Sequence, residues 1–464
     1  MNDLAKRALQ DTTLFPYWLD SPDAPNVEPQ LIGKTEADLV IVGGGFTGLW
    51  AAIQAKEANP GMDVVLVEAG KVAYGASGRP GGIVSTSVMH GLSNAVRIFP
   101  KDMEMLEQLG HDNMAGFTAT LEKHNIDCHQ EWGGELTVAV GQEHVPVIQE
   151  EYDLHVEHGH EAELLDAEGV RGQLNSPLFA GGLWNKKNSG TVHPARLAWG
   201  LKKAALSLGV RLYEVSPMTK ITDNGTTITV KTHDGEVKAP KVLLATNAFA
   251  EGHKRIKQRV AAIRDRVLMT EPLSDEQMDR IGWANRQGVY DTRTQLNYMR
   301  LTKDNRILFG GRLGYFFNNN TDPETDRNIE VYERLGESFF NTFPQLDDVR
   351  FGHAWSGPIA LTTRMAVHFQ RYYDDKMVYA GGYSGFGVST SRFGARVGLE
   401  ILNGANAPEC QLELATTEPN WMPPEPFRWS GAMITMNALD TADEKGGWRN
   451  PWLKFVTMLG FPLS

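Results

Sequence analysis

The segment Asp38-Leu-Val-Ile-Val-Gly43-Gly-Gly45-Phe-Thr-Gly48 decides the fold of this chain. Leu39 to Val42 is a short, fully apolar run, as expected for a buried parallel strand. Three of the glycines that follow have distinct physical uses. Gly43 permits a tight turn, Gly45 lets the backbone approach a pyrophosphate, and Gly48 lets the next helix lie close to the strand. The pattern therefore predicts a Rossmann-type nucleotide-binding unit.

The residues after this segment extend the same unit. A helix is expected from about Phe46 to Ala58, with its N-terminal amides and positive dipole end directed at the phosphates. A second apolar run, Val64 to Val67, ends at Glu68, whose carboxylate is placed to accept both hydroxyls of an adenosine ribose. An acid here disfavours a 2′-phosphate, so NAD or FAD is expected rather than NADP. The alternative is a glycine-rich turn in an unrelated α/β protein.

Length and composition set outer limits. The 464 residues suffice for two or three domains, and 41% hydrophobic with 22% charged residues is ordinary for a globular protein. The formal net charge of −12 argues against a nucleic-acid partner and mildly favours a cationic or neutral substrate, although acidic surfaces usually serve solubility. Cys128 and Cys410 are too few for a disulfide framework or a thiolate metal site. His155, His158 and His160 lie among acids, and we interpret them as a solvated helical face, so no metal is predicted.

No targeting or spanning segment is expected. The first thirty residues lack the apolar core of a secretory signal, and no run of eighteen apolar residues occurs. The sequence therefore predicts a cytoplasmic protein without a membrane span.

The middle and later parts of the chain contain further predicted strands and a second glycine-rich loop. Residues 135–140 alternate like a strand, and 241–246 form another buried strand that runs into Asn247. Strand signals in 266–270, 296–301 and 306–310 together suggest an antiparallel sheet. Residues 377–402 read as a second strand, glycine-rich loop and helix, and hence as a second backbone approach to the cofactor.

These motifs resemble a known family. The resemblance is carried, in chain order, by Gly43–Gly48, Glu68-Ala69, Gly75-Ala-Ser-Gly-Arg-Pro-Gly-Gly82, Ala245-Thr-Asn247 and Gly382-Tyr-Ser-Gly-Phe-Gly387. Together they are similar to FAD-dependent amine oxidoreductases of the D-amino-acid oxidase and sarcosine oxidase type. The segment around Ser77 looks most like the γ-glutamylputrescine oxidoreductase branch. The resemblance covers about residues 36–405.

The resemblance implies an α/β (α+β) fold in which a glutathione-reductase-like, Rossmann-type FAD-binding domain is interleaved with an antiparallel-sheet substrate domain. The predicted division assigns 36–100, 190–250 and 350–410 to a discontinuous FAD-binding domain, and 101–189 with 251–349 to the substrate domain. Residues 1–35 are expected to form an extended leader, and 411–464 a C-terminal extension. The tail 448–461 has helical spacing and is interpreted as packing on its own body or on a dimer partner, with a membrane-surface helix as the alternative.

The resemblance also implies the cofactor contacts. By position they are Gly43, Gly45, Phe46, Thr47, Gly48, Glu68, Ala69, Ser77, Arg79, Gly81, Gly82, Met218, Ala245, Thr246, Asn247, Tyr383, Gly385, Phe386, Gly387 and Val388. Because no cysteine lies near Ser77 or Phe386, the FAD is expected to be non-covalent. Arg79 has an electrostatic reason to lie beside a diphosphate or a reduced flavin anion, the alternative being a cation on a flexible surface loop.

Two departures from the family pattern bear on the substrate. Sarcosine-oxidase-type members carry a lysine at the position that matches Ser389 of this chain. D-amino-acid and glycine oxidases have an arginine where Pro358 and Ile359 follow Gly357 here. Both groups would hold a substrate carboxylate, so simple α-amino acids are disfavoured. A primary or secondary amine is favoured instead.

Four residues are candidates for the substrate pocket. Tyr298 and Arg300 share one face of a strand, where Tyr298 would line an amine pocket and Arg300 would meet a remote acid. His353 and Trp355 also share a face, and the indole would form an aromatic wall for the amine. The alternatives are solvent-facing sheet positions for the first pair and core packing for Trp355.

The activity implied by the resemblance is FAD-dependent oxidation of an amine C–N bond to an imine by hydride transfer to flavin N5. The imine then hydrolyses, and O₂ or another acceptor reoxidises the flavin. One alternative is an NAD-linked dehydrogenase, which the interrupted Rossmann layout and the second glycine-rich loop disfavour. A second alternative is a flavin-binding partner subunit of a dehydrogenase complex. A homodimer is possible in either case.

Overall fold

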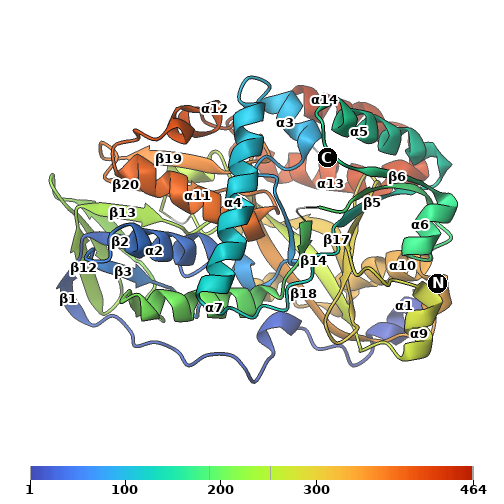
Figure 1. Ribbon diagram of the computed structural model, residues 1–464, viewed down its shortest axis with the longest axis horizontal. Helices are drawn as coiled ribbons and strands as arrows, with labels where there is room; N and C mark the ends of the chain where they lie inside the picture. The colour runs from blue at the N-terminus through green and yellow to red at the C-terminus, as the bar shows by residue number, and fades with distance from the viewer. Residues whose placement is uncertain (1, 188, 251, 462–464) are drawn as a thin grey trace.

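The protein is built on two large sheets, one in each half of the molecule. The computed structural model describes residues 2–187, 189–250 and 252–461. Figure 1 shows a six-stranded sheet with its helices on one side of the molecule and an eight-stranded sheet on the other. This mixed arrangement confirms the predicted fold class.

The six-stranded sheet contains the predicted Rossmann-type unit. Its order is β19 (His368–Tyr372), β20 (Met377–Gly381), β13 (Lys241–Leu244), β2 (Leu39–Val42), β3 (Val64–Val67) and β9 (Arg211–Tyr213). All neighbours are parallel except β19 and β20. Because both faces are covered, its central strands β2 and β3 are apolar throughout rather than alternating.

Helices cover one face of this sheet. They are α2 (Phe46–Ala58), α4 (Met103–Lys123), α7 (Pro194–Ser207) and α11 (Gly387–Leu402). On the other face lies a four-stranded sheet of order β1 (Gly33–Glu36), β12 (Gly235–Ala239), β11 (Ile228–Lys231) and β10 (Lys220–Asp223). Along β2, Leu39 and Ile41 pack toward the helices, while Val40 and Val42 pack toward the small sheet.

The eight-stranded sheet forms the second half of the molecule. Its order is β18 (Phe351–Leu361), β14 (Ala261–Thr270), β17 (Ile307–Tyr315), β16 (Tyr298–Leu301), β15 (Gly288–Asp291), β5 (Glu135–Val140), β7 (Phe179–Asn185) and β6 (Glu163–Asp166). An antiparallel sheet is predicted, but β15 and β5 run parallel. This pair joins the two separate segments of chain, so no hairpin fixes its direction.

Sheet membership also bears on the predicted domain boundaries. Strand β18 pairs with β14 along its whole length, so 351–361 goes with the eight-stranded sheet and not with the predicted 350–410 segment. The short strands β4 (Ile83–Ser85) and β8 (Ser189–Thr191) pair with each other, and β4 directly follows the glycine-rich 75–82 loop.

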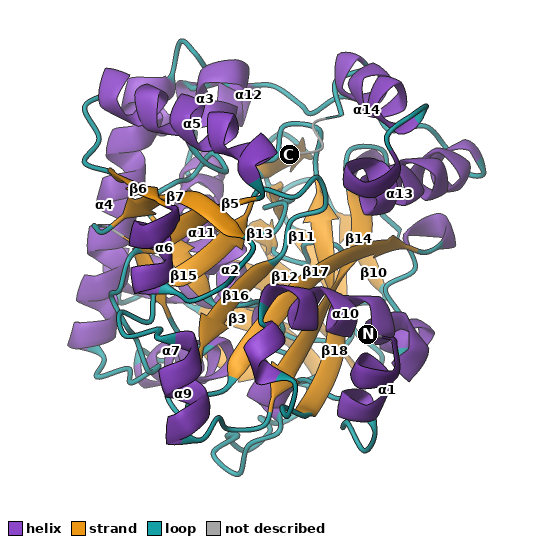
Figure 2. Cartoon of the chain, turned by 90° about the vertical axis from the view of Figure 1, so that its right-hand side faces the viewer, coloured by secondary structure: helices purple, strands orange, loops and turns teal. Residues whose placement is uncertain are grey.

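The N-terminal segment is not wholly extended as predicted. Helix α1 (Asn2–Leu9) packs its buried Ala5, Ala8 and Leu9 into the outer core of the eight-stranded sheet, beside α10 (Glu333–Thr342). Figure 2 shows α1 and α10 next to each other on this side of the molecule. The gain from burying this apolar face outweighs the small intrinsic stability of an eight-residue helix.

The remaining helices lie around the rims of the sheets. They are α3 (Leu92–Ile98), α5 (Val145–Glu157), α6 (Ala167–Gln173), α8 (Lys254–Lys257), α9 (Asp275–Ile281), α12 (Glu413–Thr416), α13 (Phe427–Lys445) and α14 (Arg449–Met458). Helices α13 and α14 pack on each other and belong to the predicted C-terminal extension. Of the helices in the described ranges, none has the length and apolar character needed to cross a membrane.

Candidate active site

A large cavity lies between the two halves of the protein. It has a volume of about 1770 Å³ and begins at the loops that follow β2, β3, β13 and β20. We call these four loops the cofactor loops, because the sequence predicts that they hold the cofactor. These loops sit at the carboxyl ends of parallel strands, where open α/β sheets bind their ligands. One drug-sized ligand takes roughly 300–1,000 Å³, so a dinucleotide and a second small molecule fit together.

The glycines after β2 adopt the geometry that a close backbone approach requires. Gly43 has φ +112, and a Cβ there would lie 2.7 Å from the carbonyl oxygen of Ala245. A Cβ on Gly48 would lie 1.9 Å from the carbonyl oxygen of Gly43, which is the predicted close contact of helix and strand. A Cβ on Gly45 would come within 3.0 Å of Ser77 Oγ. Only glycine keeps this cradle open.

Glu68 lies at the far end of the cradle. Its Oε2 accepts from the Gly44 amide at 2.6 Å, and its Oε1 accepts from the Gly70 amide at 2.8 Å. Burial raises the pKa of the Glu68 carboxyl, while the two amides act in the opposite direction. The carboxylate therefore stands at the end of β3, where the ribose contact is predicted.

Ser77 and Arg79 close the cradle from the opposite side. Ser77 Oγ accepts from the Phe46 amide at 2.9 Å, in the first turn of α2. The Arg79 guanidinium donates to the carbonyl oxygens of Tyr74 at 3.0 Å and Ser356 at 2.8 Å, and burial lowers its pKa. Arg79 is thus fixed at the cavity wall and is not a cation on a flexible loop.

The loops after β13 and β20 are joined to each other and to α2. The Gly382 amide donates to Asn247 Oδ1 at 3.0 Å. Tyr383 and Thr47 share a buried hydrogen bond of 2.8 Å between their hydroxyls. With the exception of Gly48, which underlies the turn, every predicted cofactor residue lines the cavity.

One face of the eight-stranded sheet forms the opposite wall. Tyr298 lines the cavity as predicted, and its hydroxyl donates to Asp265 Oδ2 at 2.5 Å. Burial raises the pKa of Asp265 to about 7 and that of Glu135 to about 7. Tyr290 also lines this wall and stacks on Phe386 with ring centroids 6.2 Å apart.

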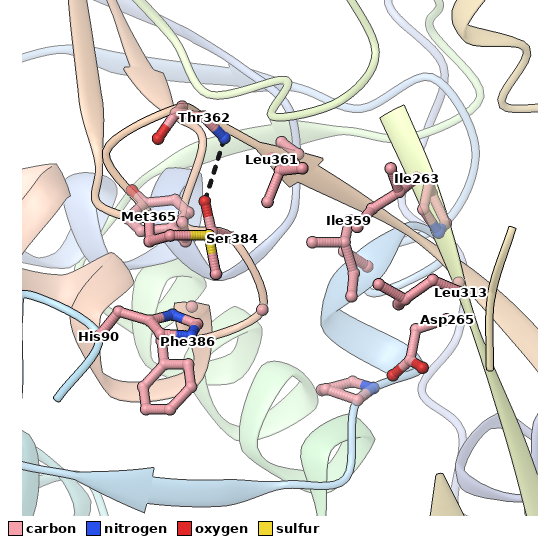
Figure 3. A pocket seen from close by; sticks show the side chains of 18 of the residues that line it. His90, Ile263, Asp265, Leu313, Ile359, Leu361, Thr362, Met365, Ser384 and Phe386 are labelled. Atoms are coloured by element: carbon pink, nitrogen blue, oxygen red, sulfur yellow. Dashed lines mark hydrogen bonds between the residues drawn. The ribbon is translucent and has the colours of Figure 1, made fainter. Parts of the chain in front are cut away.

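His90 faces this wall from the side of the cofactor loops. Figure 3 shows His90 and Phe386 on one side of the open space, with Asp265, Ile263 and Leu313 on the other. The His90 and Phe386 rings are 4.0 Å apart, and burial lowers the pKa of His90 to about 4. The imidazole is therefore neutral at pH 7.

The sequence did not single out His90, Glu135, Asp265 or Tyr290. Glu135 and Thr137 alternate with the buried Leu136 and Val138, so the sequence pattern could have placed Glu135 on the face of the strand opposite the core. His90, with φ +63, precedes Gly91 in an irregular loop and offers no such pattern.

Three predicted pocket residues lie elsewhere. Arg300 is on the same face as Tyr298 but donates to the carbonyl oxygen of Val192 at 2.6 Å, away from the cavity. Trp355 donates its indole N–H to the carbonyl oxygen of Arg79 at 2.9 Å. His353 pairs with Asp20 of the N-terminal segment at 3.1 Å. The prediction is corrected for all three, because the N-terminal segment and the 79–82 loop cover this part of the sheet.

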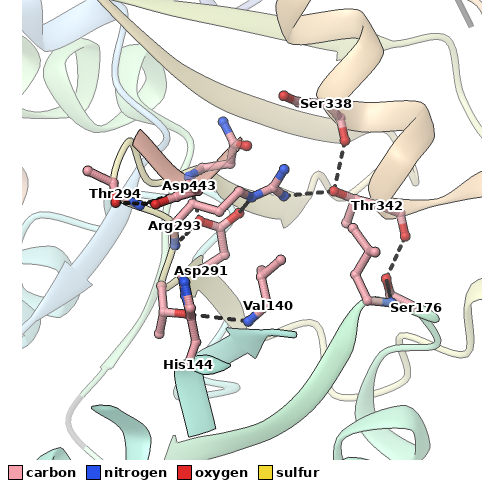
Figure 4. A network of polar contacts seen from close by, with 12 residues as sticks. Val140, His144, Ser176, Asp291, Arg293, Thr294, Ser338, Thr342 and Asp443 are labelled. Atoms are coloured by element: carbon pink, nitrogen blue, oxygen red, sulfur yellow. Dashed lines mark hydrogen bonds and ion pairs between the residues drawn. The ribbon is translucent and has the colours of Figure 1, made fainter. Parts of the chain in front are cut away.

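The cavity opens between α4, α5 and the C-terminal helices. Loop 291–297 lines the mouth, where Asp291 pairs with Arg293 at 2.7 Å and Arg293 donates to Thr342 Oγ1 at 2.9 Å. Figure 4 shows this network and the bonds of Thr294 to Asp443 on α13. The C-terminal extension is thus fastened to the loop that edges the cavity.

The two cysteines and the histidines near residue 155 lie outside this network. Cys128 and Cys410 are buried and do not line the cavity, so neither stands beside the cofactor loops. Near the mouth, His160 bonds Glu107 at 2.8 Å and His155 bonds the carbonyl oxygen of Glu151 at 2.8 Å. Within the ranges that the structure covers, no three His, Cys, Asp or Glu side chains form a metal-binding group.

Comparison with known proteins gives the class. A family model described as FAD dependent oxidoreductase matches residues 38–399, and the chain belongs to this family. The probable oxidoreductase OrdL of Haemophilus influenzae is 30% identical over 397 residues, covering 84% of this chain and 88% of that protein. Gamma-glutamylputrescine oxidoreductase of Escherichia coli is 33% identical over 372 residues, covering 79% and 84%.

Solved structures agree with the fold. Glycine oxidase from Geobacillus kaustophilus superposes with a TM-score of 0.70 at 18% identity, covering 82% of this chain and 99% of that one. The cofactor is accordingly FAD, and the cradle fits it: glycines where a Cβ would clash, a helix N-terminus that begins at Gly45 without a side-chain cap, and a strand-end acid. The family match therefore decides for FAD and against the alternative of an NAD-linked dehydrogenase.

Proposed function

We propose that this protein oxidises a primary or secondary amine to an imine with non-covalently bound FAD. The observation that carries the proposal is the chemistry of the wall opposite the cofactor loops. It presents the Asp265 carboxyl, paired with Tyr298, and among the described residues of these strands no basic side chain lines it. Such a wall suits an amine and offers nothing to a carboxylate on the reacting carbon.

Held by the loops after β2, β3 and β20, FAD would supply a two-electron acceptor for the hydride of the substrate C–H bond. The substrate loses that C–H bond and one N–H proton while the C=N bond forms. Water then hydrolyses the imine to a carbonyl compound and an amine, and O₂ or another acceptor receives the two electrons.

The side chains of the cavity orient the amine and keep water out. Ile263, Leu313 and Ile359 form an apolar surface beside Asp265 (Figure 3). Asp265, with a pKa of about 7, is placed to take the proton that an ammonium group must lose before oxidation. Neutral His90 adds no charge that would repel an ammonium group.

Two relatives support an amine substrate by their names. One is called a gamma-glutamylputrescine oxidoreductase, and the structural neighbour is a glycine oxidase. The absence of a lysine at Ser389 and of an arginine after Gly357 favours the first type of substrate over the second. Cytoplasmic location and homodimeric assembly remain predictions.

The test is the flavin absorbance near 450 nm of the purified protein, followed without oxygen as amines are added. The panel contains polyamines, γ-glutamyl amines, N-methyl amines and amino acids. We expect one class to bleach the flavin and the colour to return in air if O₂ is the acceptor. A yellow protein that no amine bleaches would contradict the proposal. Acid precipitation that leaves colour in the pellet would contradict non-covalent binding.

One observation favours a second candidate, a flavin-binding partner subunit of a dehydrogenase complex. The C-terminal helices expose large apolar side chains, among them Phe427 at 72% and Met458 at 80%. Exposed apolar patches of this kind often mark protein interfaces. In that case the isolated chain would bind FAD without being reduced by any amine.

A further inference from the structure

The sheet wall of the cavity carries two carboxyl groups with aromatic rings between them. Tyr290 on β15 stands directly opposite Tyr298 on β16, and their ring centroids are 6.4 Å apart. Asp265 lies beyond Tyr298 and Glu135 lies on the other side, on β5 next to β15. All four side chains line the cavity.

The two carboxyls differ in their partners. Asp265 accepts the Tyr298 hydroxyl. In the described part of the chain, Glu135 has no hydrogen-bond or ion-pair partner, and its Oε2 is out of contact with solvent. A carboxylate held largely out of water without a partner is costly, because no opposite charge or donor replaces the lost hydration. A positively charged ligand would supply what is missing.

The other acids of the cavity are already engaged. Glu68 accepts two backbone amides, Asp291 pairs with Arg293, Glu107 bonds His160, and Glu151 bonds Ser93. Apart from Asp265, which faces the reacting amine, Glu135 is therefore the one acid of the described lining that is left to meet a ligand.

The basic side chains of the lining do not offer a site for a negative group at this wall. Arg79 is bonded to two carbonyl oxygens, Arg293 to Asp291 and Thr342, and Arg428 to the carbonyl oxygen of Pro423. Lys454 is exposed on α14 at the outer rim. The inner wall thus selects for positive charge.

We propose that Glu135 binds a second, non-reacting ammonium group of the amine substrate. The substrate class is then an aliphatic amine with two positive charges, and its carbon chain lies along the rings of Tyr290 and Tyr298. Aromatic faces stabilise neighbouring ammonium groups and pack well on methylene chains. This inference rests on the proposed amine oxidation and adds the recognition of the far end of the substrate.

The test compares butane-1,4-diamine with 1-aminobutane, which has the same chain and one charge fewer. Binding to the FAD-loaded protein is measured by calorimetry without oxygen, and flavin bleaching is measured separately. We expect Glu135→Gln to weaken diamine binding at least about tenfold, as for loss of a charge-assisted bond. Binding of the monoamine should change less than about twofold. Glu143→Gln, at an exposed position shortly after the end of β5, should change the affinity for neither amine.

The outcomes separate this inference from the proposed function. Equal weakening of both amines, or no change for either, would overturn the role of Glu135 even if amines bleach the flavin. A Glu135-dependent preference for the diamine without bleaching would support the binding site and count against oxidation. If Glu135→Gln does not retain FAD, Glu135→Asp keeps the charge and shortens the reach. It should then weaken the diamine selectively, and an unchanged diamine affinity would overturn the inference.

Discussion

Gly48 is where α2 comes closest to the end of β2. The hydrogen that glycine carries in place of a Cβ leaves just enough room for the Gly43 carbonyl, which a methyl carbon would approach to 1.9 Å. Backbone atoms on both sides are fixed by the sheet and the helix, so neither can move without opening the phosphate turn.

We predict that Gly48→Ala loses FAD. The methyl group forces α2 off the strand, which costs several kcal/mol in a packed site, and the yellow colour should be lost on purification. The matched control is Gly172→Ala in α6, where a Cβ would meet nothing within 4 Å. That control should keep full flavin content and gain up to about 1 kcal/mol of stability. Normal flavin content in Gly48→Ala would contradict this reading of the turn.

The raised pKa of Glu135 predicts how the free energy of unfolding depends on pH. Its pKa is about 7 in the folded protein, and an ordinary glutamate in the unfolded chain titrates near 4.3. Between these values the folded state binds more protons, so the free energy of unfolding falls as pH rises through this window and is level above it.

Glu135→Gln should make this slope shallower and leave the part that Asp265, whose pKa is also raised to about 7, contributes in the same window. Relative to wild type, the variant should gain stability between about pH 5 and about pH 8, by up to roughly 3 kcal/mol. Urea unfolding at the two pH values, with flavin bound and no amine present, measures the difference. Glu143→Gln, which is exposed, should track the wild type. A slope as steep in Glu135→Gln as in the wild type would assign the titration to other groups.

At the scale of elements, the 79–82 loop is held from behind by groups that do not reach the cavity. The indole N–H groups of Trp18 and Trp355 donate to the carbonyl oxygens of Pro80 and Arg79, each at 2.9 Å. Arg300 holds Val192, whose amide donates to the Gly82 carbonyl oxygen at 2.8 Å. These contacts place a loop with few apolar residues against the cofactor cradle.

Trp355→Phe should therefore weaken FAD binding without unfolding the protein. An aromatic ring is kept and one buried carbonyl loses its donor, which costs about 1–3 kcal/mol, or roughly 5- to 150-fold in the dissociation constant of FAD. Fluorescence titration of the flavin-free protein gives that constant. Trp448→Phe, at a half-exposed indole in the C-terminal extension, should bind FAD as wild type does. Equal affinity in both variants would remove Trp355 from this role.

The elements themselves were largely readable from the sequence, because their signals are local. The apolar runs of β2, β3, β13 and β20 and the glycines after them predicted both the parallel sheet and the loops that line the cavity. Pairing between distant segments was not readable. The parallel β15–β5 pair and the burial of Arg300, His353 and Trp355 behind the N-terminal segment depend on partners far along the chain. Glu135 and Asp265 were missed for the same reason, since only the folded sheet brings them to one cavity.

At the scale of the whole molecule, the C-terminal extension forms part of the cavity mouth. Asp440 on α13 accepts from Arg312 on β17 at 2.7 Å and from Arg334 on α10 at 3.3 Å. Together with the bonds between Asp443 and Thr294 (Figure 4), these contacts fasten α13 to the eight-stranded sheet and to α10.

Asp440→Asn should loosen this fastening. Loss of partly exposed ion pairs costs about 1 kcal/mol, so local opening of α13 should rise roughly fivefold. Amide hydrogen exchange across 427–458 measures the change, and the cofactor loops should exchange as before. Asp279→Asn, at an exposed position of α9, should leave α13 unchanged. Unchanged exchange in Asp440→Asn would mean that packing alone holds the helix.

The order of strands in the two sheets has a consequence for synthesis on the ribosome. The six-stranded sheet begins with β2 near the N-terminus but is complete only when β20 has been made. The eight-stranded sheet begins with β5 in the first third of the chain but is complete only when β18 has been made. A nascent chain that has emerged only as far as β17 therefore exposes unpaired strand edges on both sheets, and such edges invite association with other chains. Slow translation or scarcity of chaperones should lower the yield of this protein more than that of a protein whose domains are contiguous.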